Sequence, residues 1–479
     1  MRYEQHGYPS IDLKSPALQQ LALRARAEIA ALAYPAQGWV QPRAGFRDVA
    51  IVGGGQSALG IAFGLKRLGI ADTVCLERAA RGHAGPWLGY ARMATLRTPK
   101  DLVGLEYGHA ALGFRAWYEA QFGASAWQGL ERIARVHWAA YLDWYADVTE
   151  PEIRYATSVA RIEPVAGGFK LHCQTSDDEF AVHARRVVLA TGFEGSGAWD
   201  VPGVVKNTVD PALWAHSNGP LPREKIAGKR VAILGHGASA FDNAAYALDN
   251  GAASVDLCFR RPKLPEINPH RWAEFAGFLD HFYDLPDALR WQLGYMFRVL
   301  DQPPTKNGVA AASAYPNFRV RPGADWQQIE NRNGALSLRT ATGAIDADFL
   351  ICATGLASDL ALRPELADLC GDIALWADRY APPADQTHAG LGAAPYLGPA
   401  FEFLEKRPGT APWLANIQCF SFSASVSHGG QCTSISGHKF SLPRLTRGLA
   451  RSFFLEQAGG LAASLAAFDA REILLPDPA

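Results

Sequence analysis

Two short segments of the sequence, residues 53–58 (GGGQSA) and 235–240 (GHGASA), place small residues at the same spacing, G-x-G-x-x-A. In this pattern the first glycine lets the chain turn sharply, the second lets backbone approach a pyrophosphate, and the last small residue lets a helix pack closely on a strand. The following helix would turn free N–H groups and its positive dipole end toward the phosphates. The pattern therefore predicts two dinucleotide sites, at Gly53, Gly55 and Ala58 and at Gly235, Gly237 and Ala240.

The residues that follow the second strand of each site differ in charge. Glu77 follows Gly53 by 24 residues, and a carboxylate there accepts hydrogen bonds from ribose hydroxyls, as FAD and NAD require. Arg260 follows Gly235 by 25 residues with Arg261 beside it, and a guanidinium there suits the ribose 2′-phosphate of NADP. We therefore expect FAD at the first site and NADPH at the second. Two alternatives stay open: a single NAD site beside a turn that only packs, and arginines that are merely a solvated strand end.

Strand–turn–helix–strand patterns must position these residues. The apolar run 48–52 leads into the first turn, a helical pattern stops at Gly69, and a second apolar run covers 73–76. Runs 230–234 and 254–259 flank the second turn in the same way. The expected fold class is α/β, with two Rossmann-like dinucleotide-binding domains. We expect an N-terminal helical extension at 1–45, an FAD domain at 46–204 and 336–479 that includes the C-terminal helices, and an inserted NADPH domain at 205–335.

Composition limits the classes of function. The 46 basic and 47 acidic residues give a formal net charge of −1, which favours neither a nucleic-acid nor a membrane partner. The N-terminus has no apolar signal segment and no run approaches about 18 apolar residues, so we expect a cytoplasmic protein without a transmembrane helix. The seven cysteines are odd in number and the chain is long, which argues against a disulfide framework, and the absence of a C-x-x-C pair argues against a dithiol reductase. The spacing of His428, Cys432 and His438 fits no standard metal motif, so no metal is expected.

Taken together, these features resemble the class B flavin monooxygenases, which comprise flavin-containing, N-hydroxylating and Baeyer–Villiger monooxygenases. The resemblance covers about residues 48–448 and rests on the GGGQSA turn, Glu77, the Trp87 of Gly85-Pro86-Trp87, the Ala-Thr-Gly turns at 190–192 and 353–355, and the Gly228-Lys229-Arg230 stretch before GHGASA. It implies that NADPH reduces FAD, that reduced flavin meets O2, and that a C4a-(hydro)peroxyflavin oxygenates a small organic substrate. The protein would mainly position both rings and shield the peroxide from water. Homo-oligomerisation stays open.

The resemblance also assigns residues to the two cofactors. The last segment of such proteins returns to the flavin, which makes Ser434, Ser436 and Gly437 candidates for contact near its C2 carbonyl, where a helix dipole would stabilise negative charge. The residues expected to bind FAD or NADPH are Gly53, Gly55, Gln56, Ser57, Ala58, Glu77, Arg78, Trp87, Val159, Thr191, Gly192, Gly235, Gly237, Ser239, Ala240, Arg260, Arg261, Thr354, Gly355, Ser436 and Gly437.

Three residues are expected to act at the reacting centre. Trp87 stands where the family places a ring near the flavin, and a core tryptophan is the alternative. Arg97 lies in a polar stretch, residues 95–100, and would hold the pyrophosphate, the nicotinamide amide or an acidic substrate; a surface loop is the alternative. His216 precedes the second turn and would either position the cofactor domain or order the linker between domains.

The stretch around His216 bears on the type of oxygenation. Baeyer–Villiger members carry F-x-G-x-x-x-H-x-x-x-W before the second turn, whereas here the upstream F-x-G is absent and Pro220 stands four residues after His216. We therefore favour N- or S-oxygenation over ester formation. Two other functions stay open: an NAD(P)H oxidase or reductase that binds FAD without productive oxygenation, and a non-catalytic flavin-binding redox sensor. The aromatic segment 265–304 would either roof the active site or form ordinary core.

Overall fold

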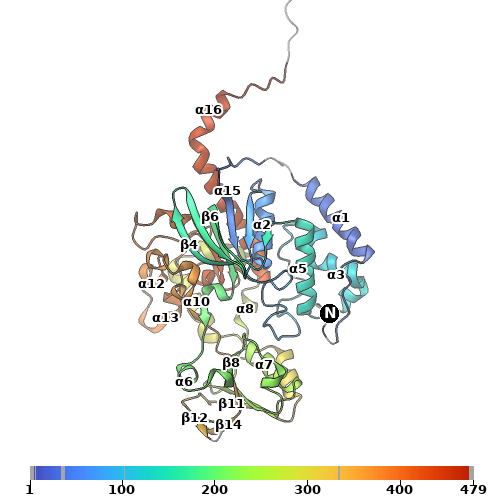
Figure 1. Cartoon of the computed structure of the whole chain (residues 1–479), viewed down its shortest axis with the longest axis vertical. Coiled ribbons are helices and arrows are strands. Elements are labelled where there is room, and N and C mark those ends of the chain that lie inside the picture. The colour runs from blue at the N-terminus through green and yellow to red at the C-terminus, as the bar shows by residue number, and fades with distance from the viewer. Residues whose placement is uncertain (1–4, 6, 34–37, 102, 333–334, 474–479) are drawn as a thin grey trace, which may run out of the picture.

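The computed structural model describes residues 5, 7–33, 38–101, 103–332 and 335–473. The chain forms two α/β units, one built around a sheet with a parallel part and one around a fully parallel sheet, and the smaller unit lies at the foot of the view in Figure 1. This arrangement confirms the expected fold class, with two Rossmann-like units in one chain.

The larger unit contains a seven-stranded sheet that changes character along one long strand, β6 (Glu179–Gly192). Through residues 184–189 this strand pairs in parallel with β1 (Arg47–Val52), and through residues 179–184 it pairs antiparallel with β5 (Gly168–Gln174). The parallel part therefore carries the first glycine turn, and the antiparallel part extends the sheet. The remaining strands are β2 (Thr73–Leu76), β3 (Ile153–Arg154), β4 (Ser158–Val165) and β17 (Ile417–Ser421).

The helix after the first turn, α2 (Gln56–Arg67), is buried along most of its length. It packs against α15 (Ile435–Gln457), a helix from the far end of the chain. The two helices approach closely because α2 carries a glycine at the contact: a Cβ on Gly60 would lie 2.5 Å from Cδ1 of Leu442. The larger unit is therefore built from both ends of the chain.

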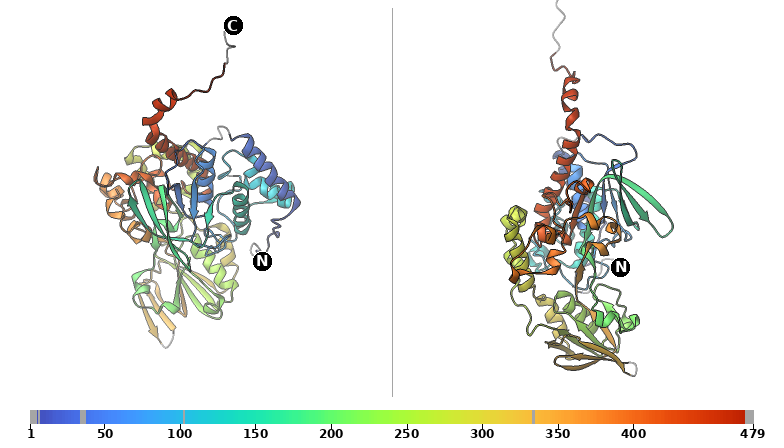
Figure 2. Two further views of the ribbon diagram at one scale, coloured as in Figure 1. Left: turned by 45° about the horizontal axis from the view of Figure 1, so that its top comes forward. Right: turned by 90° about the vertical axis from the view of Figure 1, so that its left-hand side faces the viewer.

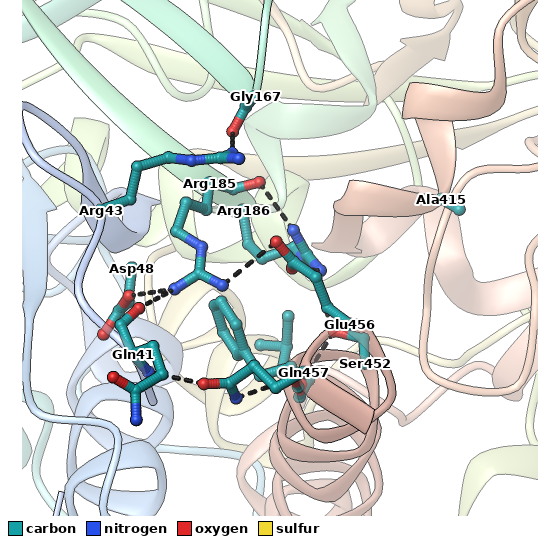
Figure 3. A network of polar contacts seen from close by, with 12 residues as sticks. Gln41, Arg43, Asp48, Gly167, Arg185, Arg186, Ala415, Ser452, Glu456 and Gln457 are labelled. Carbon is teal, nitrogen blue, oxygen red and sulfur yellow. Dashed lines mark hydrogen bonds and ion pairs between the residues drawn. The ribbon is translucent and has the colours of Figure 1, made fainter. Parts of the chain in front are cut away.

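A buried polar network fastens α15 to this sheet (Figure 3). The Arg185 guanidinium, 4% exposed, lies 2.9 Å from the Asp48 carboxylate and 3.2 Å from that of Glu456. Arg186 pairs with the same Glu456 at 2.8 Å, and both guanidiniums lie over the Phe453 ring, 4.6 and 4.7 Å from its centroid. Each buried charge thus has an opposite partner, which offsets the cost of removing it from water.

The N-terminal extension contains the expected helix, α1 (Pro16–Ala31). Ser15 caps it, because its side chain accepts a hydrogen bond from Leu18 N at 3.3 Å. The helix packs beside α3 (Phe114–Phe122) and α5 (Arg135–Thr149), which lie on the same side of the larger unit (Figure 1).

The smaller unit has a five-stranded parallel sheet in the order β11-β10-β9-β15-β8. Its fully buried strand β15 (Phe349–Cys352) lies between β9 (Arg230–Leu234) and β8 (Trp214–His216). The predicted end of this unit at residue 335 is therefore wrong, because a short apolar run does not reveal which of two parallel sheets it joins. The other strands are β10 (Ser254–Phe259) and β11 (Phe318–Pro322), and a separate antiparallel sheet holds β12 (Gln328–Arg332), β13 (Ala335–Thr340) and β14 (Gly343–Ala347).

Two connecting segments join the units and pair with each other. β7 (Gly197–Trp199) runs antiparallel to β16 (Leu356–Ser358). Beside this pair, Asp200 N donates to the Gly355 carbonyl at 3.1 Å, and the Thr354 hydroxyl donates to the Asp200 carbonyl. A two-stranded ribbon therefore carries the chain into the smaller unit and back.

The aromatic segment 265–304 forms helices that lie against the larger unit (Figure 1). Its longest helix, α10 (Asp287–Leu300), buries Trp291 against Trp376, with 6.1 Å between ring centroids. Trp376 belongs to the part of the chain after the ribbon, so this segment bridges from the insert back to its host. Two shorter helices, α8 (Pro269–Trp272) and α9 (Ala276–His281), precede it.

The described residues were also compared with the requirements of a membrane span, a disulfide and a metal site. None of the helices in the described residues has both the length and the apolar character to cross a bilayer. The seven cysteines are free thiols, and six of them are buried. Within the same described ranges, no three His, Cys, Asp or Glu side chains gather so as to hold a metal ion. Beyond α15, helix α16 (Leu461–Ala466) leads the chain away from the body of the molecule (Figure 2).

Candidate active site

The first glycine turn has the geometry that a pyrophosphate cradle requires. Gly53 has a φ of 115°, and a Cβ there would lie 2.6 Å from the Ala190 carbonyl oxygen, so a larger residue cannot fit between β1 and β6. Gly55 is the N-cap of α2 and has no side chain to bond the first amides of the helix, which face the turn. The nearest described atom to a Cβ on Gly55 would be 3.9 Å away, which leaves space for a phosphate.

Glu77 follows β2 with its carboxylate buried at this turn, 7% exposed. One oxygen accepts a hydrogen bond from Gly54 N and the other from Ala79 N, both at 2.7 Å. These bonds fix the carboxylate, and each oxygen keeps a second lone pair that suits a ribose hydroxyl. The neighbouring Arg78 is turned elsewhere, because its guanidinium pairs with Glu194 and stays 61% exposed.

Trp87 lies beside the same turn, edge-on to Trp138 with 6.4 Å between ring centroids. Trp138 Nε1 donates to Gln56 Oε1 at 3.1 Å, and the Arg135 guanidinium donates to the Trp87 carbonyl. The Trp87 Nε1–H itself is buried and has no partner among the described residues. A buried donor of this kind beside a dinucleotide turn fits the oxygen atoms of FAD.

The segment before α15 returns to the first turn. Ser57 Oγ in α2 lies 3.1 Å from Nε2 of His438, whose pKa burial lowers to about 3, so that the imidazole is neutral. Ser434 caps α15: its Oγ accepts from Gly437 N at 3.4 Å and lies 2.9 Å from Ser436 Oγ. The structure therefore brings Ser57, Ser436 and Gly437 together from opposite ends of the chain.

Three other predicted residues lie on the strands of this sheet. Thr191 and Gly192 end β6, directly after the Ala190 carbonyl that faces Gly53. Val159 is half-buried on the antiparallel strand β4, two residues after Thr157, whose N–H donates to the Glu77 carbonyl at 2.8 Å. Thr191 and Gly192 thus adjoin the turn, whereas Val159 lies farther along the sheet.

The second glycine turn repeats the geometry of the first. Gly235 has a φ of 144°, and a Cβ there would lie 2.3 Å from the carbonyl oxygen of the residue that follows β15. Gly237 is the N-cap of α7 (Ala238–Asp249), and no described atom lies within 4 Å of a Cβ placed there. Ser239 and the buried Ala240 stand in the first turn of that helix. This turn fits a second pyrophosphate.

The two arginines after β10 have different surroundings. Arg261 pairs with Asp301 at 3.2 Å, and the same carboxylate lies 2.8 Å from Nε2 of His236, inside the glycine turn. Arg260 is exposed beside them. Arg260 is therefore the better placed of the two to meet a 2′-phosphate. The role of Asp301 escaped prediction, although the Gln-Pro-Pro that follows it marks a loop entering the site.

His216 ends β8 beside the connecting ribbon and is 7% exposed. Its ring stacks on Trp199, with centroids 5.1 Å apart and planes 19° apart, and its Nδ1 accepts from Asn218 N at 3.2 Å. Burial lowers the pKa of His216 to about 4, so that the ring is neutral near pH 7. Thr354 and Gly355 lie in the same ribbon, through their bonds to Asp200. These contacts order the linker, and a role for His216 in positioning the cofactor domain stays a prediction.

Two arginines in the segment 90–100 of the larger unit, Arg92 and Arg97, contact the inserted part of the chain. Arg92 donates to two carbonyls of the linker after β8, one of them that of Gly219 at 2.7 Å. Arg97 donates to the Pro303 carbonyl at 3.0 Å. Burial lowers the pKa of both guanidiniums below the ordinary value. Arg97, expected at the reacting centre, therefore lies at the seam between the units.

Two polar residues near Arg97 were missed by the sequence patterns. Asp242, on α7, faces Arg97, and burial raises its pKa to about 6 while the charge of Arg97 opposes that rise. The signal that could have found it is a carboxylate one helical turn into the second dinucleotide helix. Gln431, which precedes α15, is 8% exposed and donates to the His270 carbonyl at 2.8 Å. Its sequence neighbours give no comparable signal.

Comparison with known proteins adds sequence and fold relatives. A model of the family described as L-lysine 6-monooxygenase/L-ornithine 5-monooxygenase matches residues 46–303. The FAD-dependent urate hydroxylase of Xanthomonas campestris is 41% identical over 464 residues, covering 96% of this chain and 98% of that protein. The ornithine hydroxylase of Pseudomonas aeruginosa aligns with a TM-score of 0.65 at 20% identity, over 85% of this chain and 99% of that one. The L-lysine 6-monooxygenase of Pseudomonas syringae aligns with a TM-score of 0.61 at 18% identity, with the same coverage.

Proposed function

Because the chain belongs to the L-lysine 6-monooxygenase/L-ornithine 5-monooxygenase family, NADPH-dependent flavin monooxygenases that bind FAD, we propose that it hydroxylates a small heterocyclic molecule, with urate as the first candidate. The observation that carries this proposal is the 41% identity to a urate hydroxylase across 96% of the chain. That identity extends over both units and the aromatic segment between them, whereas the two solved amino-acid hydroxylases align at about half that identity.

The residues of the chain divide the binding tasks. The turn at Gly53 and Gly55 and the amides of α2 would hold the FAD pyrophosphate, and Glu77 its ribose. The turn at Gly235 and Gly237 would hold NADPH, with Arg260 on the 2′-phosphate. Bound FAD, reduced by NADPH, supplies the electrons with which one atom of O2 enters the substrate and the other leaves as water.

The aromatic segment 265–304 supports a second task, the exclusion of water. Its helices α8 to α10 lie against the larger unit, and Arg290 in α10 donates to the Ser427 carbonyl at 3.2 Å, a few residues before α15. A cover at this place would keep solvent from the region where the end of the chain returns to the first turn.

A coupled assay tests the proposal. Purified enzyme with bound FAD is given NADPH and O2 with urate, L-ornithine or L-lysine, and NADPH consumption, peroxide release and product mass are followed. We expect urate to raise NADPH consumption about tenfold or more over the substrate-free rate, with a product one oxygen heavier and little peroxide. Peroxide equal to the NADPH consumed with all three compounds would instead mean an oxidase.

A second candidate is N-hydroxylation of a diamino acid. The family description and the fold relatives favour it, and it agrees with the prediction of heteroatom oxygenation over ester formation. In the same assay this function would give a hydroxylamine from ornithine or lysine and leave urate unchanged.

A further inference from the structure

Three segments that are far apart in sequence meet at the seam between the two units, close to Arg97. From the larger unit, Arg97 donates to the Pro303 carbonyl of the insert at 3.0 Å. From the other end of the chain, Gln431 Nε2 donates to the carbonyl of His270 in α8 at 2.8 Å. The residue before it, Gly430, approaches the imidazole so closely that a Cβ there would lie 3.3 Å from Cε1 of His270. Gln302, next to Pro303, lies 3.5 Å from the Asn268 side chain just before His270, and the charge of Arg97 acts on His270. These links place Arg97, His270 and Gln431 in one neighbourhood.

The charge of this neighbourhood is positive. The charges of Arg132 and Arg271 both act on Arg97, and that of Arg298 acts on His270. The carboxylates here are Asp242, which faces Arg97, Glu274, which interacts with Arg132 and Arg271, and Asp301, which acts on His270 but is already engaged by His236 and Arg261. The four arginines named above outnumber these three carboxylates. An anionic ligand is favoured here, and a ligand with two ammonium groups is not.

His270 contributes a neutral ring. Burial lowers its pKa, and the charges of Arg97 and Arg298 lower it further. Its imidazole stacks on Phe297, with centroids 5.0 Å apart and planes 21° apart, which holds its orientation. A neutral imidazole offers one N–H donor and one acceptor nitrogen, and so can face either group of a ligand.

Gln431 contributes an acceptor that nothing in the described chain satisfies. Its side chain is 8% exposed, and Oε1 is buried without a hydrogen-bond partner among the described residues. Because buried polar atoms are nearly always bonded, this oxygen indicates a ligand that brings an N–H donor. The guanidinium of Arg97 has the opposite requirement, since its N–H groups seek carbonyl or anionic oxygens.

We infer that Arg97, His270 and Gln431 form the substrate-recognition group of this enzyme, and that it selects a flat heterocyclic anion with alternating C=O and N–H groups over a diamino acid. Urate has this chemistry: carbonyl oxygens for Arg97, N–H groups for the Gln431 oxygen, and a negative charge for the basic surroundings. The inference rests on the function proposed above and goes beyond it by naming the groups that choose the substrate.

Binding and reduction, measured separately, test the assignment. Urate binding to the FAD-loaded enzyme is followed by equilibrium dialysis, and flavin reduction by NADPH without substrate is followed by stopped-flow absorbance. We expect Arg97→Gln to raise the Kd for urate about tenfold to a hundredfold and Gln431→Leu about fivefold to thirtyfold, the usual effect of losing one hydrogen bond to a charged or buried group. Flavin reduction by NADPH should stay within about twofold of wild type in Gln431→Leu, because that side chain is assigned to no cofactor. Arg97 also contacts the insert, so its variants are compared by their Kd for urate.

Two further variants serve as the conservative substitution and the control. Arg97→Lys retains the charge but loses the planar fork, so its Kd should fall between wild type and Arg97→Gln. Arg115→Gln removes an exposed guanidinium, 68% accessible in α3, and should leave urate binding unchanged. If both Arg97 variants bind urate within about twofold of wild type, the assignment is overturned, although wild-type turnover of urate would still uphold the proposed function. If wild type binds ornithine or lysine and not urate, the inferred substrate class and the proposed substrate fall together.

Discussion

Arg260 and Arg261 are neighbours in sequence, yet Asp301 engages only one of them, and this difference gives a residue-scale test of the second site. Arg260→Ala should weaken NADPH binding about tenfold to a hundredfold, because a charge-assisted bond to the 2′-phosphate is worth roughly 1.5–3 kcal/mol. NADH, which lacks that phosphate, should bind as before. The apparent Kd of each coenzyme from the rate of flavin reduction is the measurement, and an equal loss for both would contradict the assignment.

The two N-cap glycines allow a matched pair of substitutions. A Cβ on Gly55 would have its nearest described neighbour, the Gly85 backbone nitrogen, at 3.9 Å, and one on Gly237 would have none within 4 Å. The Cβ therefore fits at either position, and the indole beyond it would occupy the space expected for the pyrophosphate. Gly55→Trp should give folded, colourless protein without flavin. Gly237→Trp should give yellow protein that NADPH no longer reduces. Flavin absorbance and the melting temperature of each variant are the measurements, and a fully yellow Gly55→Trp protein would refute the first site.

At the scale of elements, the network of Arg185, Asp48 and Glu456 joins α15 to β1 and β6 (Figure 3). Arg185→Leu should lower the free energy of unfolding by roughly 3–5 kcal/mol, because it leaves the Asp48 carboxylate buried and unpaired. Urea unfolding is the measurement. The control is Arg161→Leu, which removes an ion pair of which both side chains are about half exposed, and which should have little effect.

The same substitution has a pH dependence with a defined sign. Burial raises the pKa of Asp48 in the folded protein, and Arg185 opposes that rise. Without Arg185 the folded-state pKa rises further above the unfolded value, so the folded state gains stability by holding a proton and loses it as pH rises through that pKa. The deficit of Arg185→Leu relative to wild type should therefore shrink as the pH is lowered through the raised pKa of Asp48. A deficit that grows in acid would contradict this account of the network.

Some helices and strands could be predicted from the sequence, whereas the position of others in the sheets could not. The two glycine turns, α1 and the buried strands beside the turns could be predicted because steric and periodic signals within a few residues determine them. The place of β15 could not, because its four apolar residues suit either parallel sheet and only long-range pairing decides between them. The same holds for side chains: Glu77 was expected at its turn, whereas the pairing of Arg78 with Glu194 and the unsatisfied oxygen of Gln431 depend on residues far away in sequence.

At the scale of the whole molecule, Arg92 is one residue that fixes the position of the smaller unit relative to the larger one. Arg92 donates to carbonyls of the linker after β8 and lies over the ring of Tyr246 in α7, 5.1 Å from its centroid. Arg92→Gln should slow reduction of the flavin by NADPH about tenfold or more, because small misplacements of reacting groups are costly, while leaving FAD content unchanged. Stopped-flow absorbance is the measurement. Reduction by dithionite, which needs no domain contact, serves as control, and an unchanged rate with NADPH would contradict the role.

The order of the strands has a consequence for how the protein is made. Every strand of the smaller unit's parallel sheet lies between residues 214 and 322 or at 349–352, whereas the larger sheet lacks β17 until residues 417–421 and α15 until residue 457. As the chain leaves the ribosome, the smaller unit can therefore complete its parallel sheet before β17 and α15 of the larger unit have been synthesised. We expect the nascent protein to acquire its nicotinamide-nucleotide half first and to become competent for flavin only near the end of translation. Until β17 is made, residues 187–192 of β6 lack their partner strand on one side, and this open edge could pair with another chain.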